Sequence, residues 1–129
     1  MPEFKIMKRV AILASGSGSN AENIIKYFSS NNEVEVPFVI SNRKEVYVHE
    51  RCKKLSVPSY FFSKVDFENG VVTKFLLDNK IDLVVLAGFL LRIPNDMLEA
   101  YPNMIINIHP SLLPKYGGKG MYGDNVHKA

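Results

Sequence analysis

An asparagine and a histidine stand two residues apart at the end of an apolar run, where their side chains could do chemistry. Residues 104–108 are typical of a strand, which leads through Asn107 to His109 before Pro110 stiffens the chain. An amide can donate to a developing oxyanion, and an imidazole can pass a proton near neutral pH. Two residues apart on a strand, the side chains lie on one side. A buried histidine satisfied by a backbone carbonyl is the alternative, but the paired asparagine and the strand end favour catalysis.

A second stretch with functional spacing is A-S-G-S-G-S-N, residues 14–20, between an apolar run and a helical pattern. Its glycines allow a ligand close to the backbone, and a helix N-terminus presents free N–H groups to an anion. The loop lacks the Gly-Lys-Ser/Thr of a P-loop and the third glycine of the dinucleotide fingerprint. We expect it to bind a phosphate, with Ser17, Ser19 or Asn20 capping the helix. We also expect Gly18→Val to abolish binding and leave the fold largely intact. The alternative is a tight turn that simply needs glycine and a cap.

Apolar runs and helical patterns alternate along the chain. Strands alternating with helices imply parallel pairing through right-handed crossovers, so we expect an α/β fold with a doubly wound, mainly parallel sheet. Pro37 predicts that the second strand begins irregularly or lies near an edge. Strands are predicted over 10–14, 34–41, 58–62, 83–87 and 104–108, and helices over 21–28, 47–55, 67–79 and 96–101.

The order of these elements predicts where a ligand binds. In open α/β sheets the ligand lies beyond the carboxyl ends of the strands. The segments that end four of the strands should therefore open onto one edge and form one site: 14–20, 40–43, 87–92 and 107–110.

Composition narrows the function classes. The 129 residues fit one domain, with 47% hydrophobic and 22% charged residues and a net charge of +3. The basic residues are scattered, which disfavours a nucleic-acid track. The single cysteine, Cys52, excludes an internal disulfide and fits a reducing, cytoplasmic compartment. No apolar run approaches a membrane span. No metal site is expected, because Cys52 stands alone and the three histidines, His49, His109 and His127, are far apart in sequence.

Three motifs together resemble those of the glycinamide ribonucleotide formyltransferases: N-I-H-P-S-L-L-P-K-Y-G-G from residue 107, A-S-G-S-G-S-N from residue 14 and L-A-G-F from residue 86. The resemblance covers nearly the whole chain from Arg9. It implies a Rossmann-like formyltransferase fold. It also implies transfer of a formyl group from 10-formyltetrahydrofolate, as co-substrate, to the amine of glycinamide ribonucleotide in de novo purine biosynthesis. The implied partners are small molecules, with no metal, nucleic acid or membrane, and the enzyme would be a monomer or homodimer.

The resemblance also implies roles for individual residues. Asn107 and His109 match the catalytic pair. The ribonucleotide and its phosphate would be bound by Gly18, Ser19, Asn20 and Pro110. The folate pocket would be lined, largely through backbone groups, by Leu86, Leu90, Arg92, Ile93 and Asn107.

The chain departs from the family pattern at its end. Family members continue beyond Ala129, and their third catalytic residue, an Asp in a later loop, has no counterpart here. We therefore expect residues 1–129 to be the N-terminal portion of a formyltransferase domain, inactive alone. Two alternatives are another formyltetrahydrofolate-using enzyme (a deformylase or methionyl-tRNA formyltransferase) and a non-catalytic nucleotide-binding module. A nicotinamide-dependent dehydrogenase is disfavoured, because Ser41-Asn42-Arg43 follows the second strand where an acidic residue would stand.

Overall fold

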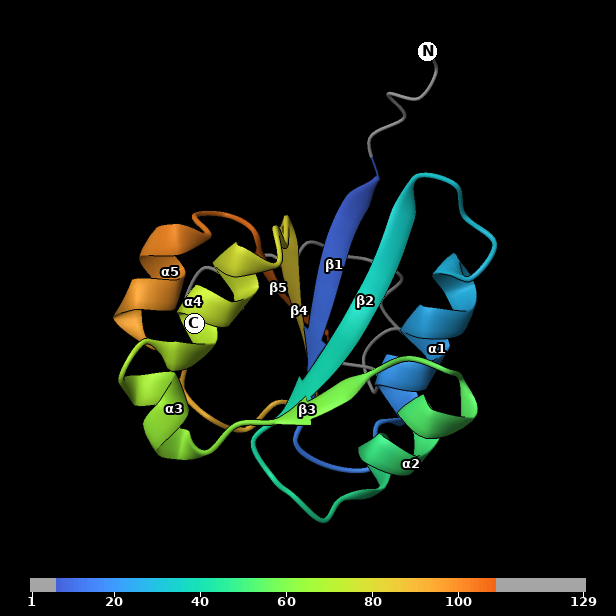
Figure 1. The fold of residues 1–129 in the computed structure, drawn as a ribbon, viewed down its shortest axis with the longest axis horizontal. Coiled ribbons are helices and arrows are strands. Elements are labelled where there is room, and N and C mark those ends of the chain that lie inside the picture. Colours follow the sequence, from blue (N-terminus) through green and yellow to red (C-terminus); the bar gives the residue numbers. More distant parts are fainter. Residues whose placement is uncertain (1–6, 109–129) are drawn as a thin grey trace.

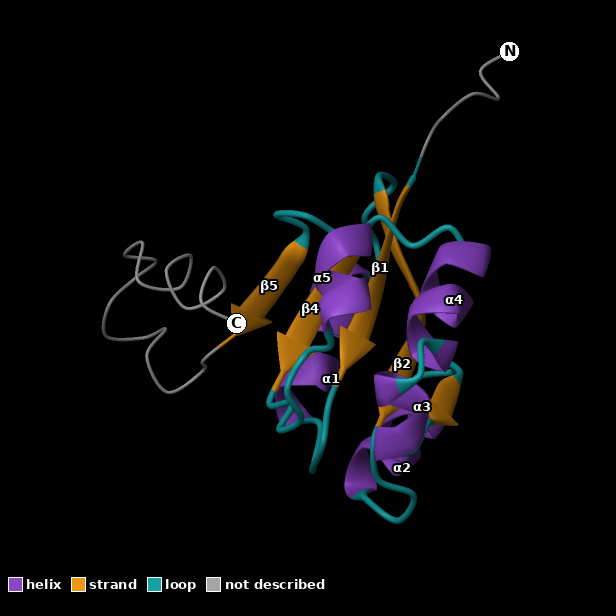
Figure 2. Ribbon diagram, turned by 90° about the vertical axis from the view of Figure 1, so that its left-hand side faces the viewer, coloured by secondary structure: helices purple, strands orange, loops and turns teal. Residues whose placement is uncertain are grey.

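Five parallel strands form one sheet in the computed structural model, which describes residues 7–108. The strands are β1 (Lys8–Leu13), β2 (Val34–Ser41), β3 (Ser59–Phe61), β4 (Leu83–Ala87) and β5 (Ile105–Ile108). Their order across the sheet is β3-β2-β1-β4-β5, every pairing is parallel, and the arrowheads of β1, β4 and β5 point the same way in Figure 2. This confirms the predicted fold class, and each predicted strand is present with small shifts at its ends.

Helices cover both faces of the sheet, as a parallel sheet requires. On one side lie α1 (Ser19–Phe28) and α2 (Tyr47–Lys54). On the other lie α3 (Lys64–Glu68), α4 (Val71–Asp78) and α5 (Asn95–Ala100) (Figure 1). The sheet is therefore doubly wound. None of the helices described between residues 7 and 108 has the length and apolar character needed to cross a bilayer.

The core consists of two layers that meet at β1. Ala11 and Leu13 belong to the layer packed by α3, α4 and α5, while Val10 and Ile12 belong to the layer packed by α1 and α2. This alternation follows from the two-residue period of a strand and makes β1 apolar at every one of these positions. Cys52 of α2 is buried in the second layer, and its burial raises the pKa of the thiol to about 11.

Pro37 lies where β2 tolerates a missing N–H group. The register between β1 and β2 shifts between Arg9 and Ala11, which leaves an irregularity in β2 close to Pro37. On the other side of β2, β3 pairs only with Val39 to Ser41. Proline in a sheet is confined to such places, so the expected irregular start of this strand is confirmed.

The single helix predicted over 67–79 is wrong, because two helices occupy this region. Gly70 adopts φ +89, a left-handed conformation, and ends the run between α3 and α4. The side chain of Asn69 accepts a hydrogen bond from the Val71 N–H at 3.1 Å, and a capping box at Ser63 begins α3 earlier than predicted. Both helices bury side chains against the same face of the sheet, so the apolar spacing continues across the break and conceals it.

An apolar groove lies on the α1 side of the sheet. Its volume is about 500 Å³. Within the described residues β5 pairs with β4 alone, so β5 forms one edge of the sheet (Figure 2). The groove is lined by Lys8, Val10, Ile24, Phe28, Val34, Asp82, Leu83, Val85, Met104, Ile106 and Ile108.

We expect Gly70→Ala to lower the free energy of unfolding by about 1–2 kcal/mol, the typical cost of a left-handed conformation for a residue with a Cβ. The added Cβ would lie 3.6 Å from the nearest side-chain atom, Asp96 Oδ2, so the loss reports backbone strain and no collision. Gly16→Ala is the matched control, because its Cβ would meet nothing within 4 Å and its φ is not positive. Urea unfolding of the two variants measures the difference, and equal stabilities would contradict the strain at Gly70.

Candidate functional site

The direction in which successive strands are added to the sheet reverses at β1. From β1 it winds outward to β2 and β3, then crosses back to β4 and β5 on the other side of β1. Leu13 and Leu86 are register partners near the carboxyl ends of β1 and β4, so the loops that follow these strands begin side by side. One loop leads to α1 on one face of the sheet, and the other leads to α5 on the opposite face. Such a switch point is where open α/β sheets bind ligands.

A buried serine joins three of the loops at this edge. The Ser15 hydroxyl donates to Asn42 Oδ1 at 2.6 Å and accepts from the Leu90 N–H at 2.8 Å. The Ser15 N–H donates to the Gly88 carbonyl at 3.2 Å. Three of the four segments predicted to share one edge are therefore in direct contact. Ser15 was not among the residues predicted for the site, although a serine directly after a buried strand is a signal that could have indicated it.

The glycine loop turns its carbonyl groups toward α1 and α2. The Gly16 carbonyl accepts from the Val48 N–H, and the Gly18 carbonyl accepts from the Glu22 N–H. The Ser17 carbonyl accepts from Arg51 Nε at 2.6 Å. Within residues 7–108, the backbone N–H groups of residues 16–21 have no such acceptor. Successive free N–H groups before and in the first turn of a helix form a concave, anion-binding arrangement.

The start of α1 differs from the sequence prediction. Gly18 is the N-cap, with φ +80, and no side chain caps the helix, so Ser17, Ser19 and Asn20 do not play the predicted capping role. A Cβ on Gly18 would lie 2.3 Å from Val48 Cγ2, and its left-handed backbone would be strained as well. The expectation that Gly18→Val leaves the fold largely intact is therefore wrong. This glycine is required for α2 to pack against the loop.

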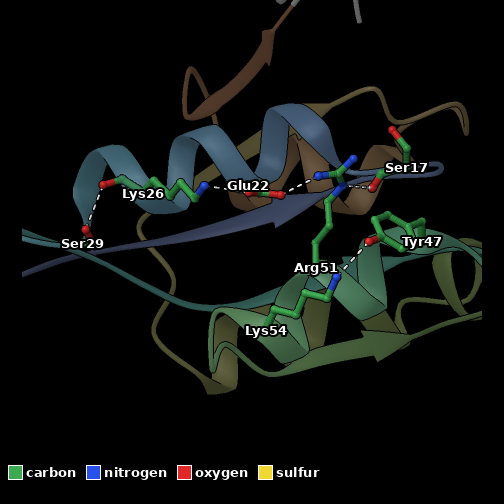
Figure 3. A network of polar contacts seen from close by, with 7 residues as sticks. All are labelled: Ser17, Glu22, Lys26, Ser29, Tyr47, Arg51 and Lys54. Carbon is green, nitrogen blue, oxygen red and sulfur yellow. Dashed lines mark hydrogen bonds and ion pairs between the residues drawn. The ribbon is translucent and has the colours of Figure 1, made fainter.

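Charged side chains of α1 and α2 form a network of polar contacts beside the glycine loop (Figure 3). Arg51 of α2 pairs with the Glu22 carboxylate at 2.5 Å, and Lys26 pairs with it at 2.8 Å. These two cations, Lys26 first and Arg51 second, lower the pKa of Glu22, so the carboxylate stays ionised. The Arg51 guanidinium also lies over the Tyr47 ring, 4.8 Å from its centre. The negative charge in the first turn of α1 is thus compensated by cations on both sides.

Asn107 lies near the carboxyl end of β5, beside β4. Its register partner is Leu86, which is buried in the layer covered by α3, α4 and α5. Ile105 belongs to the same layer, whereas Ile108 packs against the opposite one, so alternation places Asn107 on the α5 side of the sheet. His109 and Pro110, the other residues predicted in this segment, lie outside the described residues.

The residues predicted to line the folate pocket differ in exposure. Leu86 and Ile93 are buried in the core. Leu90 is 77% exposed, and Arg92 is exposed too and borders a small cavity of about 120 Å³ beside Phe67. The backbone of this segment is held at the sheet edge, because the Leu90 N–H donates a hydrogen bond to the Ser15 hydroxyl.

Both ring nitrogens of His49 have hydrogen-bond partners, which indicates a structural role. Its Nε2 lies 3.0 Å from the Arg43 carbonyl and its Nδ1 lies 2.8 Å from Ser59 Oγ. Because a carbonyl only accepts, Nε2 carries a proton, and in the neutral ring Nδ1 accepts from the Ser59 hydroxyl. Among residues 7–108, His, Cys, Asp and Glu do not assemble into a metal-binding group of three or more.

Known proteins resemble this chain in sequence. A phosphoribosylglycinamide formyltransferase of Arabidopsis thaliana, described as chloroplastic, is 37% identical over 95% of this chain and 44% of its own length. The Haemophilus influenzae protein of the same name is 35% identical over 94% of this chain and 63% of its own length. The chain thus spans less than two thirds of these curated relatives.

Solved structures resemble it in fold. Glycinamide ribonucleotide transformylase 1 of Geobacillus kaustophilus has a TM-score of 0.74 and 33% identity, covering 95% of this chain and 69% of that one. Phosphoribosylglycinamide formyltransferase of Streptococcus pneumoniae has a TM-score of 0.70 and 37% identity, covering 95% and 68%. A family profile described as formyl transferase matches residues 8–128. With its switch-point site and a match over nearly all its residues, the chain belongs to the formyl transferase family.

Proposed function

We propose that this chain carries the substrate-binding edge of a phosphoribosylglycinamide formyltransferase. Such an enzyme transfers a formyl group from 10-formyltetrahydrofolate to the amine of glycinamide ribonucleotide. The observation that carries the proposal is a row of backbone N–H groups, residues 16–21, that have no acceptor within residues 7–108 and lie at the same sheet edge as Asn107. The proposal treats residues 1–129 as the N-terminal portion of the formyltransferase domain.

The phosphate of the ribonucleotide would occupy the loop before α1. Gly18 permits the turn, and the N–H groups of Ser19 and Asn20 lie in the first turn of the helix without an acceptor in the described part of the chain. The helix dipole adds a partial positive charge there. Because Arg51 and Lys26 compensate Glu22, its carboxylate does not cancel that attraction.

Asn107 would act on the reacting formyl group. When the substrate amine attacks the formyl carbon, negative charge develops on the formyl oxygen, and the Asn107 amide would donate a hydrogen bond to it. His109 would supply or relay the proton that lets the folate nitrogen leave, and Pro110 would border the substrate. Because both residues lie outside the described region, their roles rest on the family resemblance.

The folate would lie along the segment after β4. In the sequence resemblance this contact is made largely by backbone groups, and the segment's backbone is held at the edge by Ser15 while the Leu90 side chain is exposed. Leu86 and Ile93, both buried, would support the segment from the core side.

The relatives' names favour this reaction over the alternatives. The curated and solved relatives described above are named for phosphoribosylglycinamide or glycinamide ribonucleotide. Neither a tRNA substrate nor a deformylation is named among them. A cytoplasmic location and a monomeric or homodimeric state stay predictions.

We expect Ser19→Asp to separate ligand binding from folding. A carboxylate in the first turn of α1 should stabilise the helix by about 0.3–1 kcal/mol, because it interacts favourably with the helix dipole. The same carboxylate should compete with a phosphate for the free N–H groups and weaken binding by about tenfold, equivalent to about 1.4 kcal/mol. Calorimetric titration with glycinamide ribonucleotide, in competition with inorganic phosphate, measures affinity, and thermal unfolding measures stability.

Asn23→Asp is the control for that experiment. It adds the same charge one turn further along α1, where the dipole and the free N–H groups no longer act directly. Its affinity should stay close to that of the unsubstituted protein. An unchanged affinity in Ser19→Asp, or an equal loss in both variants, would remove the loop from the site.

Substitutions of the predicted catalytic pair in the full-length protein should lower turnover and leave substrate binding nearly unchanged. Asn107→Ala loses an oxyanion donor, which typically costs about 10²–10³ in kcat. His109→Ala loses an acid–base group, worth about 10²–10⁴. The double variant should lose less than the product of the single losses, because both residues act on one transition state. Steady-state kinetics tests this, and a lowered melting temperature with preserved turnover would assign the two residues to structure instead.

A further inference from the structure

The segment after β4 is fixed at the sheet edge by hydrogen bonds more than by packing. Gly88 has no side chain and adopts φ +74, and Leu90 is 77% exposed. Only Phe89 between them packs, with its ring centre 5.1 Å from that of Phe67. The backbone on either side of Phe89 is bound to Ser15, through the Gly88 carbonyl and the Leu90 N–H. The position of residues 88–90 therefore depends on the hydrogen bonds of Ser15 together with the packing of Phe89.

Ser15 can hold this position because it is itself fully engaged. Ser15 is 1% exposed. Its hydroxyl donates a hydrogen bond to Asn42 Oδ1 and accepts one from the Leu90 N–H. Without the hydroxyl, the Leu90 N–H and the Asn42 side-chain oxygen would each lose the partner of a part-buried hydrogen bond. Loss of such a bond is destabilising, so the segment would shift to find another partner.

The same residue begins the glycine loop. Ser15 directly precedes Gly16, whose carbonyl is held separately by the Val48 N–H of α2, and Arg51 holds the next carbonyl. The free N–H groups of the loop thus have supports of their own. Loss of the Ser15 hydroxyl would free the Leu90 end of the segment, while the hydrogen bond from the Ser15 N–H to Gly88 and the glycine loop stay in place.

We propose that Ser15 is a positioning residue that sets the place of the formyl-folate segment relative to the ribonucleotide loop; this inference rests on the function proposed above. A transfer between two bound substrates depends on their relative placement, and small displacements lower its rate. Ser15 contacts neither reacting atom. It acts through the backbone of Gly88 and Leu90.

The test compares Ser15→Ala with Ser30→Ala in the full-length protein. Ser30 follows the C-terminal end of α1, away from the glycine loop; it is exposed, and its hydroxyl makes no hydrogen bond within the described part of the chain. For Ser15→Ala we expect the KM for 10-formyltetrahydrofolate to rise up to about tenfold, in line with the loss of one hydrogen bond. The KM for glycinamide ribonucleotide should change by less than about twofold, because the loop's N–H groups stay in place. Ser30→Ala should leave both constants unchanged.

A second readout does not depend on activity. Hydrogen exchange at the Leu90 amide, measured without ligand, should become at least about tenfold faster in Ser15→Ala, because this amide loses its acceptor. Amides of β1 and β4 should keep their protection, and Ser30→Ala should not alter Leu90 exchange.

Asn42→Ala keeps the test decisive if Ser15→Ala fails to fold. It removes the acceptor of the Ser15 hydroxyl proton from a half-buried position and leaves Ser15 bound to Leu90. It should raise the KM for the formyl donor in the same direction by a smaller factor, with ribonucleotide KM preserved.

The outcomes separate the two proposals. Formyl transfer by the unsubstituted protein, together with an equal rise of both KM values or unchanged Leu90 exchange in Ser15→Ala, would overturn the positioning role alone. Absence of transfer in the unsubstituted full-length protein would overturn the proposed function and, with it, this inference.

Discussion

The parallel pairing of β1 on both of its sides is the constraint on which the structure depends. Because β1 pairs with β2 and with β4 in the same direction, the carboxyl ends of all three strands reach one edge. Parallel strands need crossover connections, and these place helices on both faces. The strand is consequently buried from both sides, with Ala11, Ile12 and Leu13 fully enclosed. The loops after β1 and β4 leave toward opposite faces and create the switch point.

Backbone polarity, more than side-chain chemistry, shapes the edge of the sheet near α1. Val48, Arg51 and Glu22 donate to the loop's carbonyl groups, and the loop's N–H groups have no acceptor in the described part of the chain. Arg51 has two effects there: it binds the Ser17 carbonyl and it compensates the Glu22 carboxylate. An ionised, unpaired carboxylate in this turn would repel an anion at the helix N-terminus. The ion pairs remove that repulsion without removing the helix dipole.

The spacing of apolar residues predicted the secondary structure correctly where a single strand or helix period runs through the whole element. The run of residues 83–87 gave a buried strand in both sequence and structure, because a parallel strand is apolar on both faces. The break at Gly70 was missed because α3 and α4 share one face of the sheet, so the apolar spacing runs through it. The capping prediction failed for a different reason. Gly18 has a left-handed backbone conformation and lies against Val48 of α2. No local sequence pattern indicates this contact between the loop and α2.

The sequence by itself determined the alternation of strands and helices, the edge at which a ligand would bind and the residues that match the formyl transferase family. These follow from short-range periodicity, from the parallel rule and from motifs that are contiguous in the chain. Only the tertiary structure showed that Ser15 joins Asn42 and Leu90, and that Arg51 braces the glycine loop. Those hydrogen bonds connect residues 27, 75 and 34 positions apart. Contacts over such separations leave no periodic trace, because they form only after the sheet has brought the ends of its strands together.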